Sequence, residues 1–242
     1  MLGFFPLLIL NARPGAGKSE IIQALQQTPL ESRIGRFHVG PLHILDDFPM
    51  LWAWFEEDAL LERVFHRPRL HTTPDEYFLH HDLWHVLIHR LCLEYEKFVR
   101  DQPEGHTIIL EFSRGSEQGG YRAAYQHLST RVLQQAACLY VRVSFEESLR
   151  KNQARFNPDR PDSILEHGLS DRKLERLYRH DDWADFTGAD PACLLLGRLR
   201  VPYAVFENED DVTTRAGEPL LQRLEIALGR LWDLRQVSIS AA

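Results

Sequence analysis

The sequence predicts an α/β protein in which a parallel sheet of five strands carries helices on both faces. Short apolar or β-branched segments alternate along the chain with longer amphipathic ones, and a glycine-rich loop joins the first apolar segment to a helix. No linker of distinct composition divides the chain. We therefore expect a single domain over residues 1–242, with a helical insertion at about 49–104.

Five segments have the length and composition of buried strands. They are Phe4–Leu10, Arg33–Val39, Thr107–Phe112, Cys138–Ser144 and Tyr203–Phe206, with Leu42–Leu45 either continuing the second strand or forming a short separate one.

Helices are expected between these strands. They lie at about 20–27, 50–64, 118–136, 145–156, 170–180 and 217–235, and a further helix begins after Thr73-Pro74. The buried face of that further helix comprises Trp84, Leu87, Ile88, Leu91, Tyr95 and Phe98, which recur at helical spacing.

Composition narrows the classes of partner. At 44% hydrophobic and 26% charged residues, the chain resembles an ordinary soluble globular protein. A net charge of −7 gives no basic surface for nucleic acid. The apolar N-terminus is too short to span a membrane and lacks the features of a signal peptide. Three isolated cysteines favour a reducing cytoplasm. We expect a small-molecule substrate and leave a homodimer open.

Residues 12–19, Ala-Arg-Pro-Gly-Ala-Gly-Lys-Ser, are the most informative segment. They follow an apolar strand and precede a helix, the order typical of a phosphate-binding loop. The glycines let backbone N–H groups turn inward, and a helix N-terminus favours an anion. The predicted nucleotide-binding residues are Pro14, Gly15, Ala16, Gly17, Lys18 and Ser19.

The last two residues of this loop carry the expected chemistry. Lys18 can reach the β- and γ-phosphates and is a candidate catalytic residue, while the Ser19 hydroxyl can ligate Mg²⁺. We therefore expect ATP and Mg²⁺ as cofactors. Ala12 stands where the strictest form of the pattern has glycine.

Together with three later segments, this loop resembles the P-loop kinases of the nucleoside and nucleotide kinase type, which implies a P-loop NTPase fold. His43–Phe48 is similar to the strand followed by Asp-x-Phe in uridine-kinase-like enzymes. The resemblance implies that Asp46 takes the proton from the acceptor hydroxyl. Asp47 is the alternative base, and a helix N-cap is the structural alternative.

Glu111 ends the third predicted strand and resembles the acidic residue that holds Mg²⁺ or its water in these kinases. The family often has Glu-Gly at this place, whereas this chain continues as Phe112-Ser113-Arg114-Gly115. That order is also similar to the Glu-Arg-Ser of deoxynucleoside kinases with one residue inserted, so the subfamily stays open. A solvated strand-end carboxylate is the alternative.

Arg150, Lys151 and Arg155 resemble the arginine-bearing lid of the superfamily, which we place at about 145–162. Arg150 and Arg155 are candidate catalytic residues, because a closing lid would neutralise charge on the transferring phosphoryl group. They are five residues apart, or about 140° around a helix, and need not contact the same group. A solvated basic helix face is the alternative.

Two further segments have weaker patterns. Asn208 follows the last strand and is expected to contact adenine, with a plain acidic turn as the alternative. His81, His85 and His89 recur every four residues, superficially like a zinc-protease helix. Their carboxylate is Asp82 rather than glutamate, and no third ligand follows, so we expect a solvated flank without zinc.

The sequence thus predicts an ATP- and Mg²⁺-dependent phosphotransferase that acts on a hydroxyl of a small metabolite. A nucleoside, nucleotide, sugar or aminoglycoside-like acceptor is compatible. The alternatives are a nucleotide-binding ATPase and a regulatory switch protein without transfer. A switch GTPase should carry Asn-Lys-x-Asp, which Asn208–Asp211 does not supply.

Overall fold

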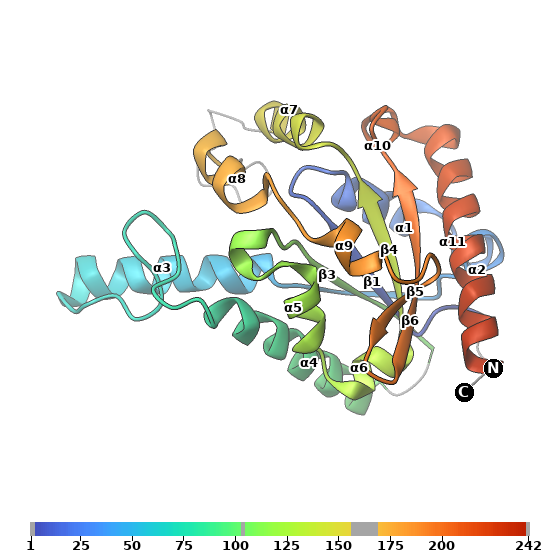
Figure 1. Cartoon of the computed structure of the whole chain (residues 1–242), viewed down its shortest axis with the longest axis horizontal. Coiled ribbons are helices and arrows are strands. Elements are labelled where there is room, and N and C mark those ends of the chain that lie inside the picture. The colour runs from blue at the N-terminus through green and yellow to red at the C-terminus, as the bar shows by residue number, and fades with distance from the viewer. Residues whose placement is uncertain (1–2, 103–104, 156–168, 241–242) are drawn as a thin grey trace.

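The computed structural model describes residues 3–102, 105–155 and 169–240, in which a twisted sheet lies between two layers of helices (Figure 1). Over these residues the sheet has six strands in the order β2-β3-β1-β4-β6-β5. They are β1 (Leu7–Ala12), β2 (Leu42–Asp46), β3 (Thr107–Phe112), β4 (Ala136–Arg142), β5 (Cys193–Leu196) and β6 (Leu199–Glu207). The first five strands of that order are parallel, and β5 pairs antiparallel with β6.

The core has two halves, one on each face of the sheet. All six residues of β1 are buried, and they alternate: Leu8 and Leu10 join one apolar cluster, and Leu7 and Ile9 join the other. This burial on both faces explains why the strand is apolar throughout. The first cluster packs on α1 (Lys18–Gln27), α2 (Leu30–Phe37) and α11 (Gly217–Ser240), and the second on α4 (Leu83–Asp101), α5 (Gly120–Gln126), α6 (Thr130–Gln135) and α9 (Trp183–Thr187). The remaining helices are α3 (Phe48–Phe65), α7 (Phe145–Arg155), α8 (Asp171–Tyr178), α10 (Val212–Arg215) and a 3-10 turn at Ser116–Gln118.

The predicted parallel arrangement holds for five of the six described strands, but the sheet is mixed and the predicted count of five is wrong. A hairpin with the two-residue turn Gly197-Arg198 adds β5 at the edge, and Gly197 has a φ of 62°. A glycine between two apolar runs is the sequence signal for such a turn. The predicted strand Arg33–Val39 is wrong as well. Residues 30–37 form α2, in which Arg33 and Phe37 are buried one helical turn apart.

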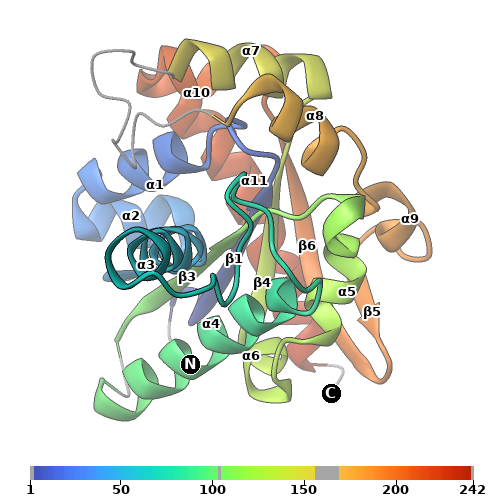
Figure 2. The same cartoon turned by 90° about the vertical axis from the view of Figure 1, so that its left-hand side faces the viewer.

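The predicted insertion consists of α3, the returning segment 66–82 and α4. α3 projects from the body in Figure 1 and is seen end-on in Figure 2, with α4 below it and α7 and α8 above it in both views. Asp58 ties the returning segment to α3, because its carboxylate accepts the N–H groups of Leu70, His71 and Thr72 at 2.6–2.9 Å.

Two helices begin or end elsewhere than predicted. α4 begins at Leu83 rather than after Thr73-Pro74, because Thr73 N–H bonds to the Tyr77 carbonyl in a turn and Glu76 has a φ of 57°. The helix predicted over 118–136 is two helices, and Ser129 caps the second by accepting the Val132 N–H at 3.3 Å. Among the described residues, no helix combines the length and apolar composition needed to cross a bilayer.

Replacing Asp58 with asparagine should loosen the returning segment, because an amide NH₂ then faces backbone donors. We expect the free energy of unfolding to fall by about 1–3 kcal/mol in a denaturant titration. The exposed Asp101→Asn change is the matched control and should shift it by less than about 0.5 kcal/mol. Equal stability of the two variants would contradict this role of Asp58.

Candidate functional site

The loop between β1 and α1 is shaped to receive an anion. Gly15 and Gly17 have φ values of 73° and 108°, in the left-handed region that glycine enters without strain. Gly17 caps α1 and has no side chain, so no side chain satisfies the first N–H groups of the helix. Those groups and the positive end of the helix are available to a phosphate.

Side chains from distant segments hold this loop in place. Arg13 donates to the Val143 carbonyl at 3.1 Å, and its Nη2 lies 2.7 Å from Asp181 Oδ2. Ser148 of α7 donates to the Pro14 carbonyl at 2.8 Å. The loop is therefore fixed to the end of β4 and to α7 by its surroundings.

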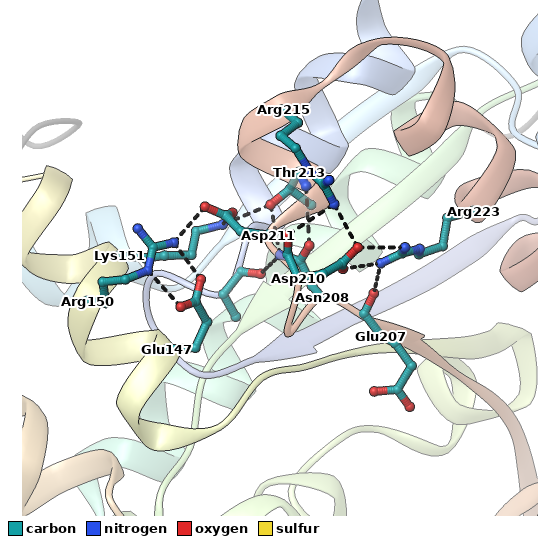
Figure 3. Close-up of polar contacts among 11 residues, drawn as sticks. Glu147, Arg150, Lys151, Glu207, Asn208, Asp210, Asp211, Thr213, Arg215 and Arg223 are labelled. Carbon is teal, nitrogen blue, oxygen red and sulfur yellow. Dashed lines mark hydrogen bonds and ion pairs between the residues drawn. The ribbon is translucent and has the colours of Figure 1, made fainter.

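Asn208 supports the loop from inside the protein (Figure 3). Its Nδ2 donates to the Ala16 carbonyl and to Thr213 Oγ1, each at 2.8 Å, and its Oδ1 accepts the Thr213 N–H. A Cβ on Gly17 would lie 2.5 Å from Thr213 Oγ1, so this support also requires glycine there. The expectation that Asn208 contacts adenine is wrong, because its side chain is fully buried and all its polar atoms are bonded within the protein.

A charged network extends this support to α7 (Figure 3). Lys151 is buried, and its Nζ lies 2.6 Å from Asp211 Oδ1 and 2.8 Å from Thr213 Oγ1. Arg150 pairs at the surface with Asp211 and Glu147, each at 2.6 Å. Arg150 thus holds α7 against the segment after β6. The structure does not place Arg150 among the described residues that line the pocket, contrary to the expected catalytic position.

Arg155 occupies the position expected of a pocket arginine. Its Nη2 donates to Ser19 Oγ at 3.1 Å, and it lines the same pocket as the loop. The separation of Arg150 and Arg155 follows from the helical angle between positions five apart. Residues 156–162 of the predicted lid lie outside the described residues.

Lys18, at the start of α1, lies close to Glu111, near the end of β3. Lys18 Nζ donates to Ser113 Oγ at 2.8 Å and lies 3.6 Å from Glu111 Oε1. Burial raises the pKa of Glu111, and the charge of Lys18 opposes that rise. Ser113 was absent from the sequence prediction, although it lies two residues after the predicted acid.

Asp46 lies in register with Glu111 at the adjacent end of β2. Its Oδ1 accepts the Phe48 N–H at 3.0 Å, so the residue also supports the start of α3. Burial, followed by repulsion from Glu111 and Asp47, raises the pKa of Asp46 to about 7. A carboxylate with this pKa exchanges a proton readily near neutral pH.

Asp47, the neighbour of Asp46 in the chain, pairs with a buried arginine. Its Oδ2 lies 2.7 Å from Arg114 Nη1, and both side chains are buried. Arg114 also donates to the carbonyls of Ser113 and Trp84, at 2.7 and 3.2 Å. Asp47 is therefore held in a buried ion pair. Asp46, by contrast, takes part in none of the ion pairs of the described residues.

These groups surround a pocket of about 240 Å³. The loop, Lys18 and Ser19 form one end, and Asp46 and Glu111 lie beside them. The other walls come from the start of α3, the start of α4 and the end of α8.

The oxygens of Ser19 and Glu111 suit Mg²⁺. Both residues line the pocket beside the loop, and Mg²⁺ binds hard oxygen ligands, commonly one or two from protein with the rest from phosphate and water. The site could therefore hold Mg²⁺ together with a bound phosphate.

The histidines gather at the start of α4. His85 stacks on His127 with ring centroids 4.1 Å apart, and His89 Nε2 lies 3.2 Å from His127 Nδ1. Burial and the neighbouring histidines lower the pKa of His85 and of His127. Within the described ranges, no three or more His, Cys, Asp or Glu side chains are arranged to hold a metal ion.

Comparisons with known proteins give only distant structural likenesses. No protein-family model and no curated protein matches the chain. A gluconokinase from Sinorhizobium meliloti 1021 superposes with a TM-score of 0.46 at 13% identity, covering 99% of each chain. A Thermus thermophilus protein gives 0.45 at 17% identity, over 91% of this chain and 94% of that one. A shikimate kinase from Acinetobacter baumannii, in complex with shikimate, gives 0.32 at 13%, over 71% and 75%. At these values, the likeness assigns no activity to the chain.

The raised pKa of Asp46 predicts a pH-dependent cost in stability. Between pH 3.8, its ordinary pKa, and about 7, the folded chain keeps a proton that the unfolded chain releases. Stability therefore falls as pH rises through this range and stays low above it. Asp46→Asn should remove this loss, so the variant should gain about 1–3 kcal/mol over the natural chain at pH 8 and less at pH 5.

Denaturant titrations at the two pH values measure this difference, with exposed Asp75→Asn as the control. A gap that is the same at pH 5 and pH 8 would show that Asp46 titrates normally.

Proposed function

We propose that this protein transfers the γ-phosphoryl group of ATP, with Mg²⁺, to a hydroxyl of a small metabolite. The observation that carries the proposal is the pairing of two features in one pocket. Lys18 and Ser19 lie at the open N-terminus of a helix, and Asp46, a carboxylate with a pKa of about 7, lies beside them. A phosphate site alone fits any nucleotide-binding protein, whereas an adjacent base suits transfer to a hydroxyl.

Each residue has a distinct part in this proposal. The loop N–H groups and Lys18 bind and orient the phosphates, and Asp46 accepts the proton of the attacking hydroxyl. Arg155, which already reaches Ser19, adds positive charge beside the transferring group. Mg²⁺, held by Ser19 and by Glu111 directly or through water, would neutralise charge on the phosphates.

Lys18→Ala should weaken the transition state by about 2–4 kcal/mol, because it removes the charge that faces the phosphates. Calorimetry with Mg·ATP and turnover of the folded variant measure the effect. Lys97→Ala, an exposed lysine on α4, is the matched control. If the Lys18 variant is as active as the natural protein, the loop does not bind the reacting phosphates.

Asp46→Asn should lower kcat by about 10²–10⁴-fold and leave ATP affinity nearly unchanged, since it removes the base but keeps the size. In the natural protein kcat/KM, which reports the free enzyme, should rise with pH through about 7, as Asp46 loses its proton.

Asp47→Asn provides the comparison. It leaves Arg114 buried without its carboxylate, and we expect it to lower stability by about 3–5 kcal/mol. A folded Asp47→Asn variant that loses kcat, alongside an active Asp46→Asn variant, would assign the base to Asp47. Hydrolysis of ATP at the same rate with and without any acceptor would instead favour an ATPase.

A further inference from the structure

The pocket continues past Asp46 along a wall of apolar side chains. Phe48 and Leu51 come from the first turn of α3, Trp84 from the first turn of α4, and Leu177 and Tyr178 from the end of α8. Phe48, Leu51 and Trp84 are half-buried, so they keep exposed surface for a ligand. Apolar and aromatic surface of this kind packs against a carbon skeleton.

On the described pocket lining, carboxylates outnumber cations by four to three. The carboxylates are those of Glu20, Asp46, Asp47 and Glu111, and the cations are Lys18, Arg114 and Arg155. Lys18 and Arg155 lie at the phosphate end, bonded to Ser113 and Ser19.

Arg114, the remaining cation, faces Asp47 at 2.7 Å. An anionic acceptor would have to compete with that carboxylate while lying close to Asp46. Arg114 is therefore not free to pair with an acceptor anion, while Lys18 and Arg155 lie at the phosphate end of the described lining.

Two cations of α8, Lys173 and Arg176, are also held in ion pairs. Lys173 lies 2.5 Å from Glu76, and Arg176 lies 2.9 Å from Glu117.

We propose that the acceptor is a hydroxyl compound that is neutral or positively charged, with an apolar face that packs on Leu51 and Trp84. Acceptors that carry a carboxylate or a phosphate are poor substrates, because Arg114 is already held by Asp47 and the carboxylates of Asp46 and Glu111 repel them. This inference rests on the proposed phosphotransfer and narrows its acceptor to one charge class.

Two series of hydroxyl compounds, each differing in charge, test the inference. One is a nucleoside with its 5′-monophosphate, and the other is a hexose with its amino, uronate and phosphate derivatives. ADP formation with Mg·ATP gives kcat/KM, and the mass of the product identifies transfer. We expect the neutral or amino member to exceed its anionic counterparts by at least about tenfold.

A preference for the anionic member in either series would overturn the inference and leave phosphotransfer intact. If no member accepts a phosphoryl group although calorimetry shows Mg·ATP bound, the proposed function fails, and this inference fails with it.

Two arginine substitutions on α3 test whether the apolar wall faces the acceptor. Leu51→Arg adds a cation beside the acceptor and should shift the anionic-to-neutral ratio of kcat/KM about tenfold toward the anion. Leu60→Arg, nine positions along the same helix and exposed, should leave the ratio unchanged. An unchanged ratio in a folded Leu51→Arg variant would show that this wall does not face the acceptor.

Discussion

The buried ion pair between Asp47 and Arg114 decides how the rest of the site is arranged. It joins the end of β2 to the segment after β3, and Arg114 also bonds to the Trp84 carbonyl at the start of α4. Burial raises the pKa of Asp47, and the charge of Arg114 opposes that rise. Because Asp47 is paired with Arg114, Asp46 is the neighbouring carboxylate that faces the pocket without a cation in contact among the described ion pairs. Arg114 lines the pocket but is held by Asp47 and is not available to a ligand.

The phosphate loop depends on parts of the chain far from it in sequence. Asn208 and Thr213, after β6, bond beneath Ala16 and Gly17, while Ser148 of α7 bonds to Pro14. Buried polar groups in such a network are costly to leave unpaired, so the network fixes one arrangement of the loop. The shape that receives an anion therefore exists in the protein before a ligand arrives.

Local sequence patterns predict those parts of the site that depend only on where a strand ends and the next helix begins. Lys18 and Ser19 follow from the glycine loop, and Asp46 and Glu111 from strand ends that a parallel sheet brings together. Contacts between distant segments carry no such local signal. Nothing in the sequence tells that Arg114 pairs with Asp47, that Asn208 turns inward, or which of two lid arginines faces the loop. The edge hairpin at Gly197-Arg198 carries a readable signal in the sequence, and so does α2, in which Leu30, Ile34 and Phe37 recur at helical spacing.

The phosphate end and the acceptor wall come from separate stretches of chain. The loop and its supports lie in β1, α1, α7 and the segment after β6, whereas Phe48, Leu51 and Trp84 belong to the insertion that projects beside the sheet (Figure 2). Under the proposed function, substitutions in the insertion would change which acceptor is bound and leave the phosphate loop undisturbed. Such a division would let one scaffold evolve new acceptors while its phosphate chemistry is inherited intact.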